Sequence, residues 1–155
     1  MARYSVRDTL DIYAPRDAVS KLARELGFPR RDGAELAIVV SELCTNILKY
    51  GVRGELELER CTDAVHGVGV SVVAHDVGPR FRDFEMALQD GCDDRGPIDP
   101  GTLMRRGGLG IGLGAVRRLT DFLSVDYGAQ GKAIRAVRYL RRPPRQVTLP
   151  PPPRR

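Results

Sequence analysis

A glycine-rich run places the strongest constraint on this chain, because it stands where a helix is expected to begin. Residues 107–114 hold five glycines in eight positions, and a helical apolar pattern follows over residues 112–121. Glycine inside a helix costs about 1 kcal/mol relative to alanine. The run therefore indicates either unusual backbone dihedrals or the close approach of another group, with close packing of some glycines as the alternative.

A helix N-terminus that follows glycines is suited to an anion. Its free N–H groups and positive dipole end attract negative charge, and glycines let a phosphate approach the backbone. The Walker pattern GxxxxGK[ST] is absent from the sequence. Residues 110–115 formally match GxGxx[GA], but no strand is expected directly before them, which argues against a dinucleotide-binding loop. The run therefore predicts a phosphate site of another kind, preceded by a loop that the glycines allow to hinge.

Length and charge indicate one folded domain over residues 1–140 and a tail over residues 141–155. The chain has 155 residues and is 42% hydrophobic, which is enough for a real core. The tail holds five of the 25 basic residues, none of the 20 acidic ones and six of the 11 prolines. Residues 1–140 are therefore neutral, and no nucleic-acid-binding face is expected. The tail is expected to be disordered or polyproline-like, with a docking segment as the alternative.

The composition indicates a cytoplasmic protein that does not cross a membrane. No run of 18 apolar residues is present, and the N-terminal segment is charged and alternating, unlike a signal peptide. Cys44, Cys61 and Cys92 show no CxxC spacing, so reduced thiols are expected. His66 and His75 are too few and too far apart to suggest a metal site.

Apolar periodicity predicts a β-α-α-β-β-α-β-β order. Helices are expected over residues 15–27, 33–50 and 112–121, with Asp32 as the N-cap of the second and Glu35 completing a capping box. Strands are expected over residues 4–14, 55–61, 67–74, 123–127 and 134–140. A short helix is expected near residues 82–89, and residues 90–106 lack periodicity and indicate a functional loop. The strands outnumber what three crossover helices would connect, so we expect an α+β fold whose mixed or antiparallel sheet carries helices on one face.

Three polar side chains are candidates for chemistry. Glu42 and Asn46 are four residues apart on the second helix and share one face. They form either a satisfied polar pair at a helix edge or an acid–base group beside an oxygen ligand for Mg²⁺. Asp76 ends a buried strand just before the Gly78–Pro79 turn, where its carboxylate either contacts a ligand amino group or caps the turn.

Three stretches together resemble the GHKL ATPase superfamily, whose members share the Bergerat ATP-binding fold. They are VSELCTNILKYG at 40–51, HDVGP at 75–79 and GGLGIGLGAVRRLTDF at 107–122. Within the superfamily the chain is most similar to bacterial RsbT-type serine/threonine protein kinases, which are related to anti-sigma-factor kinases. The resemblance covers residues 5–140 and implies a two-layer α+β sandwich with a mostly antiparallel sheet.

The resemblance also implies roles for the polar helix face and the strand end. Glu42 would be the general base and Asn46 the residue that binds Mg²⁺ and, through it, ATP. Asp76 would bind the adenine amino group, and Gly78 would line the adenine pocket.

The resemblance implies a phosphate side as well. Residues 91–106 would form the ATP lid, and the phosphates would meet Gly108, Gly110 and Gly112. The basic residues of the lid, among them Arg105, would either reach the γ-phosphate or solvate the loop.

The resemblance implies an ATP-dependent serine/threonine kinase of a bacterial partner-switching, stressosome-like system. Its cofactors would be ATP and Mg²⁺, and its substrate a STAS-domain antagonist protein, with a phosphatase or a sigma factor as further partners. An anti-sigma-like sequestering module and a nucleotide-free adaptor are the alternatives. The adaptor is considered because Arg80 stands where the family pattern D-x-G-x-G has its second glycine. A strained or obstructing Arg80 favours the adaptor, whereas an outward-pointing one leaves the nucleotide site open.

Overall fold

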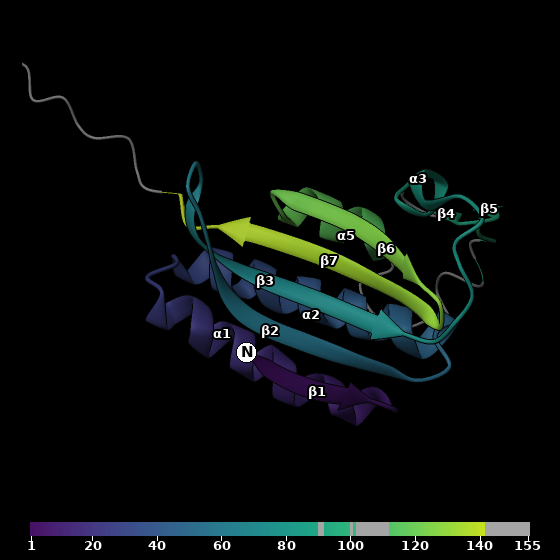
Figure 1. Ribbon diagram of the computed structural model, residues 1–155, viewed down its shortest axis with the longest axis horizontal. Coiled ribbons are helices and arrows are strands. Elements are labelled where there is room, and N and C mark those ends of the chain that lie inside the picture. The colour runs from purple at the N-terminus through teal and green to yellow at the C-terminus, as the bar shows by residue number, and fades with distance from the viewer. Residues whose placement is uncertain (90–91, 100, 102–111, 142–155) are drawn as a thin grey trace, which may run out of the picture.

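The protein folds into one sheet layer and one helix layer (Figure 1). The computed structural model describes residues 1–89, 92–99, 101 and 112–141. The sheet order is β1-β2-β3-β7-β6, with bounds Ala2–Val6, Gly54–Asp63, Gly67–Asp76, Gly131–Tyr139 and Phe122–Gly128. The helices that cover one face of it are α1 (Tyr13–Glu25), α2 (Arg30–Tyr50) and α5 (Gly112–Leu119). The expected α+β class is confirmed, and every strand pair of this sheet in the described part of the chain is antiparallel.

The core lies between α2 and the inner face of the sheet. The largest fully buried side chains come from both layers, and they include Leu36, Leu43, Ile47, Leu56, Val72 and Ile134. Each such side chain contributes about 1.5–3 kcal/mol by leaving water. Alternation in β2 places Leu56 and Leu58 in this core and the glutamates between and beside them on the other face, as the pattern predicts.

The first strand is shorter than predicted. It ends at Val6, and the rest of the expected strand contains a 3₁₀ helix, η1 (Thr9–Ile12), and the first two residues of α1. Asp8 is the N-cap of η1 and accepts a hydrogen bond from the Leu10 N–H at 2.8 Å, while the Asp11 carboxylate accepts one from the Asp8 N–H. Local side-chain hydrogen bonds therefore override the polar–apolar alternation that predicted a strand.

The start of α2 also differs from the prediction. The helix begins at Arg30 with Pro29 as its N-cap, so the capping box expected from Asp32 and Glu35 is wrong. Both carboxylates lie inside the first two turns and pair with Arg138 of β7 instead. The two carboxylates that the capping rule predicted at the helix end instead form ion pairs with a distant strand, and local sequence patterns do not reveal such tertiary contacts.

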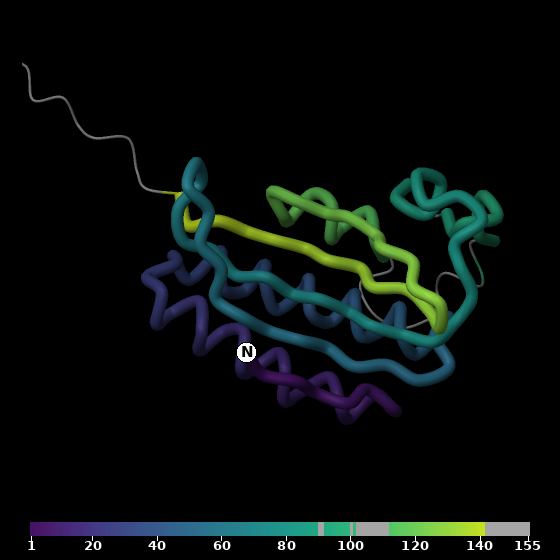
Figure 2. Tube along the Cα trace, viewed as in Figure 1, coloured from purple at the N-terminus to yellow at the C-terminus, as the bar shows by residue number. Residues whose placement is uncertain are grey.

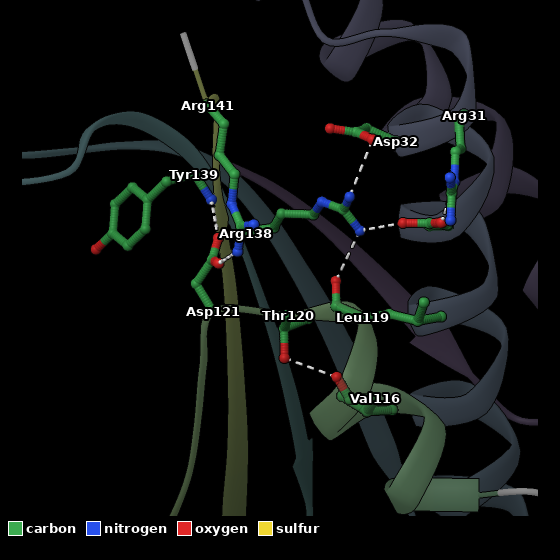
Figure 3. A network of polar contacts seen from close by, with 10 residues as sticks. Arg31, Asp32, Val116, Leu119, Thr120, Asp121, Arg138, Tyr139 and Arg141 are labelled. Atoms are coloured by element: carbon green, nitrogen blue, oxygen red, sulfur yellow. Dashed lines mark hydrogen bonds and ion pairs between the residues drawn. The ribbon is translucent and has the colours of Figure 1, made fainter. Parts of the chain in front are cut away.

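Arg138 ties β7 to both neighbouring helices (Figure 3). Its guanidinium lies 3.0 Å from Asp32 Oδ1 and donates to the backbone carbonyl of Leu119 at 2.9 Å. The second contact satisfies a carbonyl at the C-terminal end of α5 that has no partner within the helix. One side chain thereby fixes the start of α2 and the end of α5 against the same strand.

The opposite end of the sheet carries the candidate site. There β3 ends, β7 begins, and the register places Lys132 opposite Asp76. The segment that follows β3 holds α3 (Phe84–Ala87), β4 (Cys92–Asp93) and β5 (Gly96–Pro97), and it extends beyond this same end of the sheet (Figure 2). The short helix expected near residues 82–89 is thus present.

The structure bears on three expectations from composition, which concern membrane helices, the cysteines and the tail. No helix among the described residues is long and apolar enough to cross a bilayer. The three cysteines are free, and burial raises the pKa of the Cys44 thiol to about 12. Residues 142–155 of the predicted tail lie outside the described part of the chain. Arg141, the one tail residue that is described, pairs with Asp121 at 2.7 Å.

Candidate functional site

Glu42 and Asn46 lie together on the wall of a cavity. Both are on the C-terminal half of α2, and only 6% and 7% of their surfaces are exposed. The cavity has a volume of about 520 Å³, which lies within the usual range of small-molecule sites. The helical spacing of the two residues therefore brings a carboxylate and an amide to one enclosed surface, as the sequence predicts.

The Asn46 amide has an unsatisfied atom. Its Nδ2 is buried and has no hydrogen-bond partner in the structure. A buried polar atom without a partner costs about 1–3 kcal/mol, and most native structures satisfy nearly all such atoms. The orphaned amide therefore favours a polar ligand at this part of the cavity.

The described residues do not form a metal cage. None of their histidine, cysteine, aspartate and glutamate side chains gather into a group of three or more that could hold an ion. Mg²⁺ normally keeps several waters and binds through one or two protein oxygens together with phosphate oxygens. Asn46 offers one side-chain oxygen, which fits a magnesium ion whose other ligands are waters and phosphate oxygens.

Asp76 lies at the end of β3 with its side chain 1% exposed. Its Oδ1 accepts from the Gly78 N–H at 2.8 Å and from Lys132 Nζ at 2.8 Å. Its Oδ2 is buried and has no hydrogen-bond partner in the structure. One oxygen therefore caps the turn, as one of the two alternatives from the sequence predicts, while the other oxygen is left for a further donor.

Gly78 is required by close packing around Asp76. A Cβ added at Gly78 would lie 2.9 Å from Asp76 Oδ1 and 2.9 Å from the Gly51 Cα. Real Cβ atoms do not approach these atoms so closely, so any larger residue would displace the turn. This packing explains the glycine without a ligand.

Lys132 was not identified from the sequence. It is the second residue of β7, its side chain is 1% exposed, and it lines the cavity. Its ammonium group also donates to the Pro79 carbonyl at 3.0 Å and lies 5.2 Å from the centre of the Phe81 ring. The strand was predicted only from residue 134, although it begins at Gly131. The same alternation that buries Ile134 also places Lys132 on the inner face, and this is the signal that could have identified it.

Arg80 adopts an ordinary backbone conformation. No described residue other than glycine has a positive φ, so the strained alternative for Arg80 is excluded. The guanidinium lies over the Tyr127 ring, 4.6 Å from its centre, at the rim of the cavity. The cation–π contact holds the side chain against β6, which explains why an arginine is tolerated after the turn.

The phosphate side is described only in part. Gly112 begins α5 with φ +56°, and Gly112 and Leu113 line the cavity. The glycine run therefore does contain a residue with unusual dihedrals that favour glycine. Gly108, Gly110 and Arg105 lie outside the described residues. Of the expected lid, residues 92–99 and 101 are described, and several of them form a wall of the same cavity.

The cavity combines apolar surface with an excess of basic groups. Its described lining includes apolar side chains such as Phe81, Ile98 and Leu113. Three acidic side chains, Glu42, Asp93 and Asp94, stand against five basic ones, which are Lys49, Arg80, Arg82, Arg95 and Lys132. An apolar surface beside a positive field suits a planar base joined to a polyphosphate.

This fold and cavity define a class of nucleotide-binding domain. Residues 7–138 match the family described as the histidine kinase-like ATPase domain, and the chain belongs to that family. It is 34% identical to the serine/threonine-protein kinase RsbT of Bacillus subtilis (strain 168) over 132 residues, which are 84% of this chain and 90% of the relative. The resemblance to RsbT-type kinases drawn from the three motifs is confirmed.

Two solved structures share the fold. A chain of the SiaB–SiaC complex from Pseudomonas aeruginosa superposes with a TM-score of 0.58 and 15% identity, over 88% of each chain. The structure of the RsbU and RsbW domains of a Mycobacterium tuberculosis protein gives a TM-score of 0.53 at 16% identity, over 96% of this chain and 35% of the other. At these identities the similarity establishes a common architecture.

Proposed function

We propose that this protein is an ATP-dependent serine/threonine kinase of a bacterial partner-switching system, acting in the cytoplasm on a STAS-domain antagonist protein. The observation that carries the proposal is the pairing of Glu42 and Asn46 on the buried wall of one cavity. The identity to a relative named as a serine/threonine-protein kinase supports it.

Bound Mg-ATP would supply the transferable phosphoryl group, and its cation would neutralise the charge that develops during transfer. Glu42 would accept the proton of the acceptor hydroxyl as that oxygen attacks the γ-phosphorus and the bond from the γ-phosphorus to the bridging oxygen of the leaving ADP breaks. Asn46 would orient the metal through its side-chain oxygen. Both residues come from one rigid helix, so their spacing is fixed before the nucleotide binds.

The remaining residues would hold the two ends of the nucleotide. Asp76 and Gly78 would form the base end, where the carboxylate keeps one unpartnered oxygen. Gly108, Gly110 and Gly112 would present backbone N–H groups to the phosphates, and Arg105 would reach the γ-phosphate when the lid closes. These phosphate-side roles rest on the family resemblance and on the position of Gly112 at the cavity.

Partner switching is proposed from the relatives. The chain is similar to the RsbT kinase, and the SiaB–SiaC complex and the RsbU–RsbW domains are among the structures that share its fold. A phosphatase or a sigma factor would be the second partner, bound when the antagonist is phosphorylated and released. A nucleotide-free adaptor is the second candidate, because the Lys132 ammonium already occupies one oxygen of Asp76.

The test is transfer of radiolabelled phosphate from ATP to a STAS-domain protein encoded beside this gene. We expect label on a serine or threonine of the STAS protein, and loss of the label when EDTA removes Mg²⁺. ATP binding without transfer to any neighbouring STAS protein would contradict the kinase assignment and favour a sequestering module. Absence of ATP binding would favour the adaptor.

A further inference from the structure

A buried ion pair closes the inner end of the candidate base site. Lys132 and Asp76 face each other across β7 and β3, and each side chain is 1% exposed. Two charges removed from water need good geometry and additional hydrogen bonds to be tolerated. The pair has both, because Nζ lies 2.8 Å from Asp76 Oδ1 and 3.0 Å from the Pro79 carbonyl.

The two members of the pair are not equally placed toward the cavity. Lys132 belongs to its lining, whereas Asp76 is not among the described residues that line it; both residues line a second cavity on the sheet. Of the two members of the pair, a base at this wall would therefore approach the lysine. Lys132 has three N–H groups, and among the described residues two have acceptors in Asp76 and Pro79.

A carboxylate and an ammonium group select different purine edges. A carboxylate only accepts hydrogen bonds, so by itself it binds the amino group of adenine and repels the carbonyl oxygen of a 6-oxopurine. An ammonium group only donates, so it can bind N1 of adenine, and it can also bind O6 of guanine and hypoxanthine, which a carboxylate repels. A lysine that lines the cavity and neutralises the carboxylate beside it therefore offers a donor to the edge of either kind of purine.

We propose that Lys132 is a specificity-determining residue of the base site, whose ammonium group donates to the purine and lets the site bind 6-oxopurine nucleoside triphosphates alongside ATP. The proposal rests on the proposed nucleotide-binding function of this cavity and goes beyond it in the class of base accepted. GTP and ITP are the predicted additional ligands.

The geometry argues that Lys132 recognises the base and does not plug the site. The cavity keeps a volume of about 520 Å³ with the lysine in place. The ammonium is drawn toward the sheet by Asp76 and Pro79 and lies 5.2 Å from the Phe81 ring centre, so the Lys132 side chain is fixed at the wall. A fixed donor at the edge of an open cavity is the arrangement that binding sites use for specificity.

The test compares the affinities of ATP, ITP and GTP for the full chain with Mg²⁺, by calorimetry or by displacement of a fluorescent triphosphate. The wild type should bind ITP within about tenfold of ATP. Lys132→Thr should lose ITP and GTP affinity by about ten- to a hundredfold more than ATP affinity, the range expected for a charge-assisted hydrogen bond. Lys132→Arg, which keeps a charged donor, should retain ITP binding.

Lys21→Thr is the matched control. Lys21 is an exposed lysine on α1 that pairs with Asp17 at 2.7 Å, and it is not among the described residues that line the cavity. It should leave the ATP-to-ITP ratio unchanged. Thermal unfolding of each variant reports whether it folds, since Lys132→Thr leaves the Asp76 carboxylate buried without its cation.

Each contrary outcome has a distinct meaning. If Lys132→Thr binds ATP and ITP in the wild-type ratio, Lys132 does not select the base, and the proposed kinase function stands. If the variant binds both more tightly by the same factor, Lys132 blocks the site and the proposal is overturned.

If Lys132→Thr does not fold, the ratio of ATP to ITP affinity of the wild type is the test, and an ITP affinity more than about a hundredfold weaker than the ATP affinity contradicts the proposal. If the wild type binds none of the three triphosphates, the proposed function itself fails.

Discussion

At the scale of single residues, the site is marked by buried polar atoms that the protein does not satisfy. Asn46 Nδ2 and Asp76 Oδ2 are both buried without hydrogen-bond partners in the structure. Such atoms destabilise the empty protein, and a ligand that pairs with them recovers this loss on binding. The two residues belong to different elements, α2 and β3, and of the two only Asn46 is among the described residues that line the cavity.

Asn46→Ala should weaken the binding of Mg-ATP far more than that of metal-free ATP. The amide has no charge to attract the cation by itself, so its effect should appear only when the nucleotide brings the metal. Calorimetric titrations with Mg²⁺ and with EDTA measure the two affinities. Gln130→Ala, an amide-to-alanine change at an exposed hairpin position, is the control. Equal weakening in both titrations would remove Asn46 from the metal site.

Arg80→Gly should leave ATP affinity nearly unchanged and slightly destabilise the fold. Arg80 has an ordinary backbone conformation, so glycine relieves no strain and adds entropy to the unfolded chain. The change also removes the contact with the Tyr127 ring, so the free energy of unfolding should fall by about 0.5–1.5 kcal/mol. Urea unfolding and an ATP titration measure both effects. A variant that is more stable and gains ATP affinity would show that arginine obstructs the site.

At the scale of elements, the helices are positioned against the sheet by charged contacts as well as by apolar packing. Arg138 of β7 pairs with Asp32 and Glu35 of α2 and with the last turn of α5 (Figure 3). Because α2 carries Glu42 and Asn46 and α5 begins beside the cavity, these contacts at the far end of both helices fix the elements that form the site.

Arg138→Gln should destabilise the protein at neutral pH by about 2–4 kcal/mol, because it leaves partly buried carboxylates without their cation. Burial raises the pKa of Glu35, but the hydrogen bonds from Arg31 and Arg138 outweigh it, so the net pKa is lowered from 4.5. A carboxyl group whose pKa is lowered by folding stabilises the fold at pH values above its pKa in the unfolded chain. That stability is lost as the pH falls through the pKa of the folded state.

The difference in unfolding free energy between wild type and Arg138→Gln should therefore be largest above pH 4.5 and should decrease as the pH falls below 4.5. Urea unfolding over a series of pH values measures this difference. Arg135→Gln, which removes an exposed arginine from the same strand, is the control and should show little effect. A difference that stays constant down to acid pH would contradict the role of Glu35.

At the scale of the whole molecule, the sequence predicts the architecture better than the contacts between elements. The periods of α2, β2 and β3 are long and regular, and their predicted positions agree with the structure. The errors in the predicted elements arise where a polar side chain can form either a local or a tertiary contact. Asp8 and Asp11 cap a 3₁₀ helix within a segment that alternates like a strand, and Asp32 pairs with Arg138 although it could have capped α2.

The same distinction explains which site residues were found. Glu42, Asn46, Asp76 and Gly78 lie in short motifs, so a local pattern reveals them, and the structure places Glu42 and Asn46 at the cavity. Lys132 is 56 residues from Asp76, and only the register of β7 against β3 brings the two together. Register depends on packing across the whole sheet, which no local pattern specifies.

The central claim is that this cavity transfers phosphate with Glu42 as the base, and Glu42→Gln tests it most directly. The variant should bind Mg-ATP within a few-fold of the wild type, because the side-chain shape is kept and the proton acceptor is removed. Transfer to the STAS protein at saturating ATP should fall by about a hundredfold or more, the usual loss for a general base. Glu25→Gln, the same change at an exposed position of α1, should transfer normally. A Glu42→Gln variant that transfers phosphate at the wild-type rate would contradict the account.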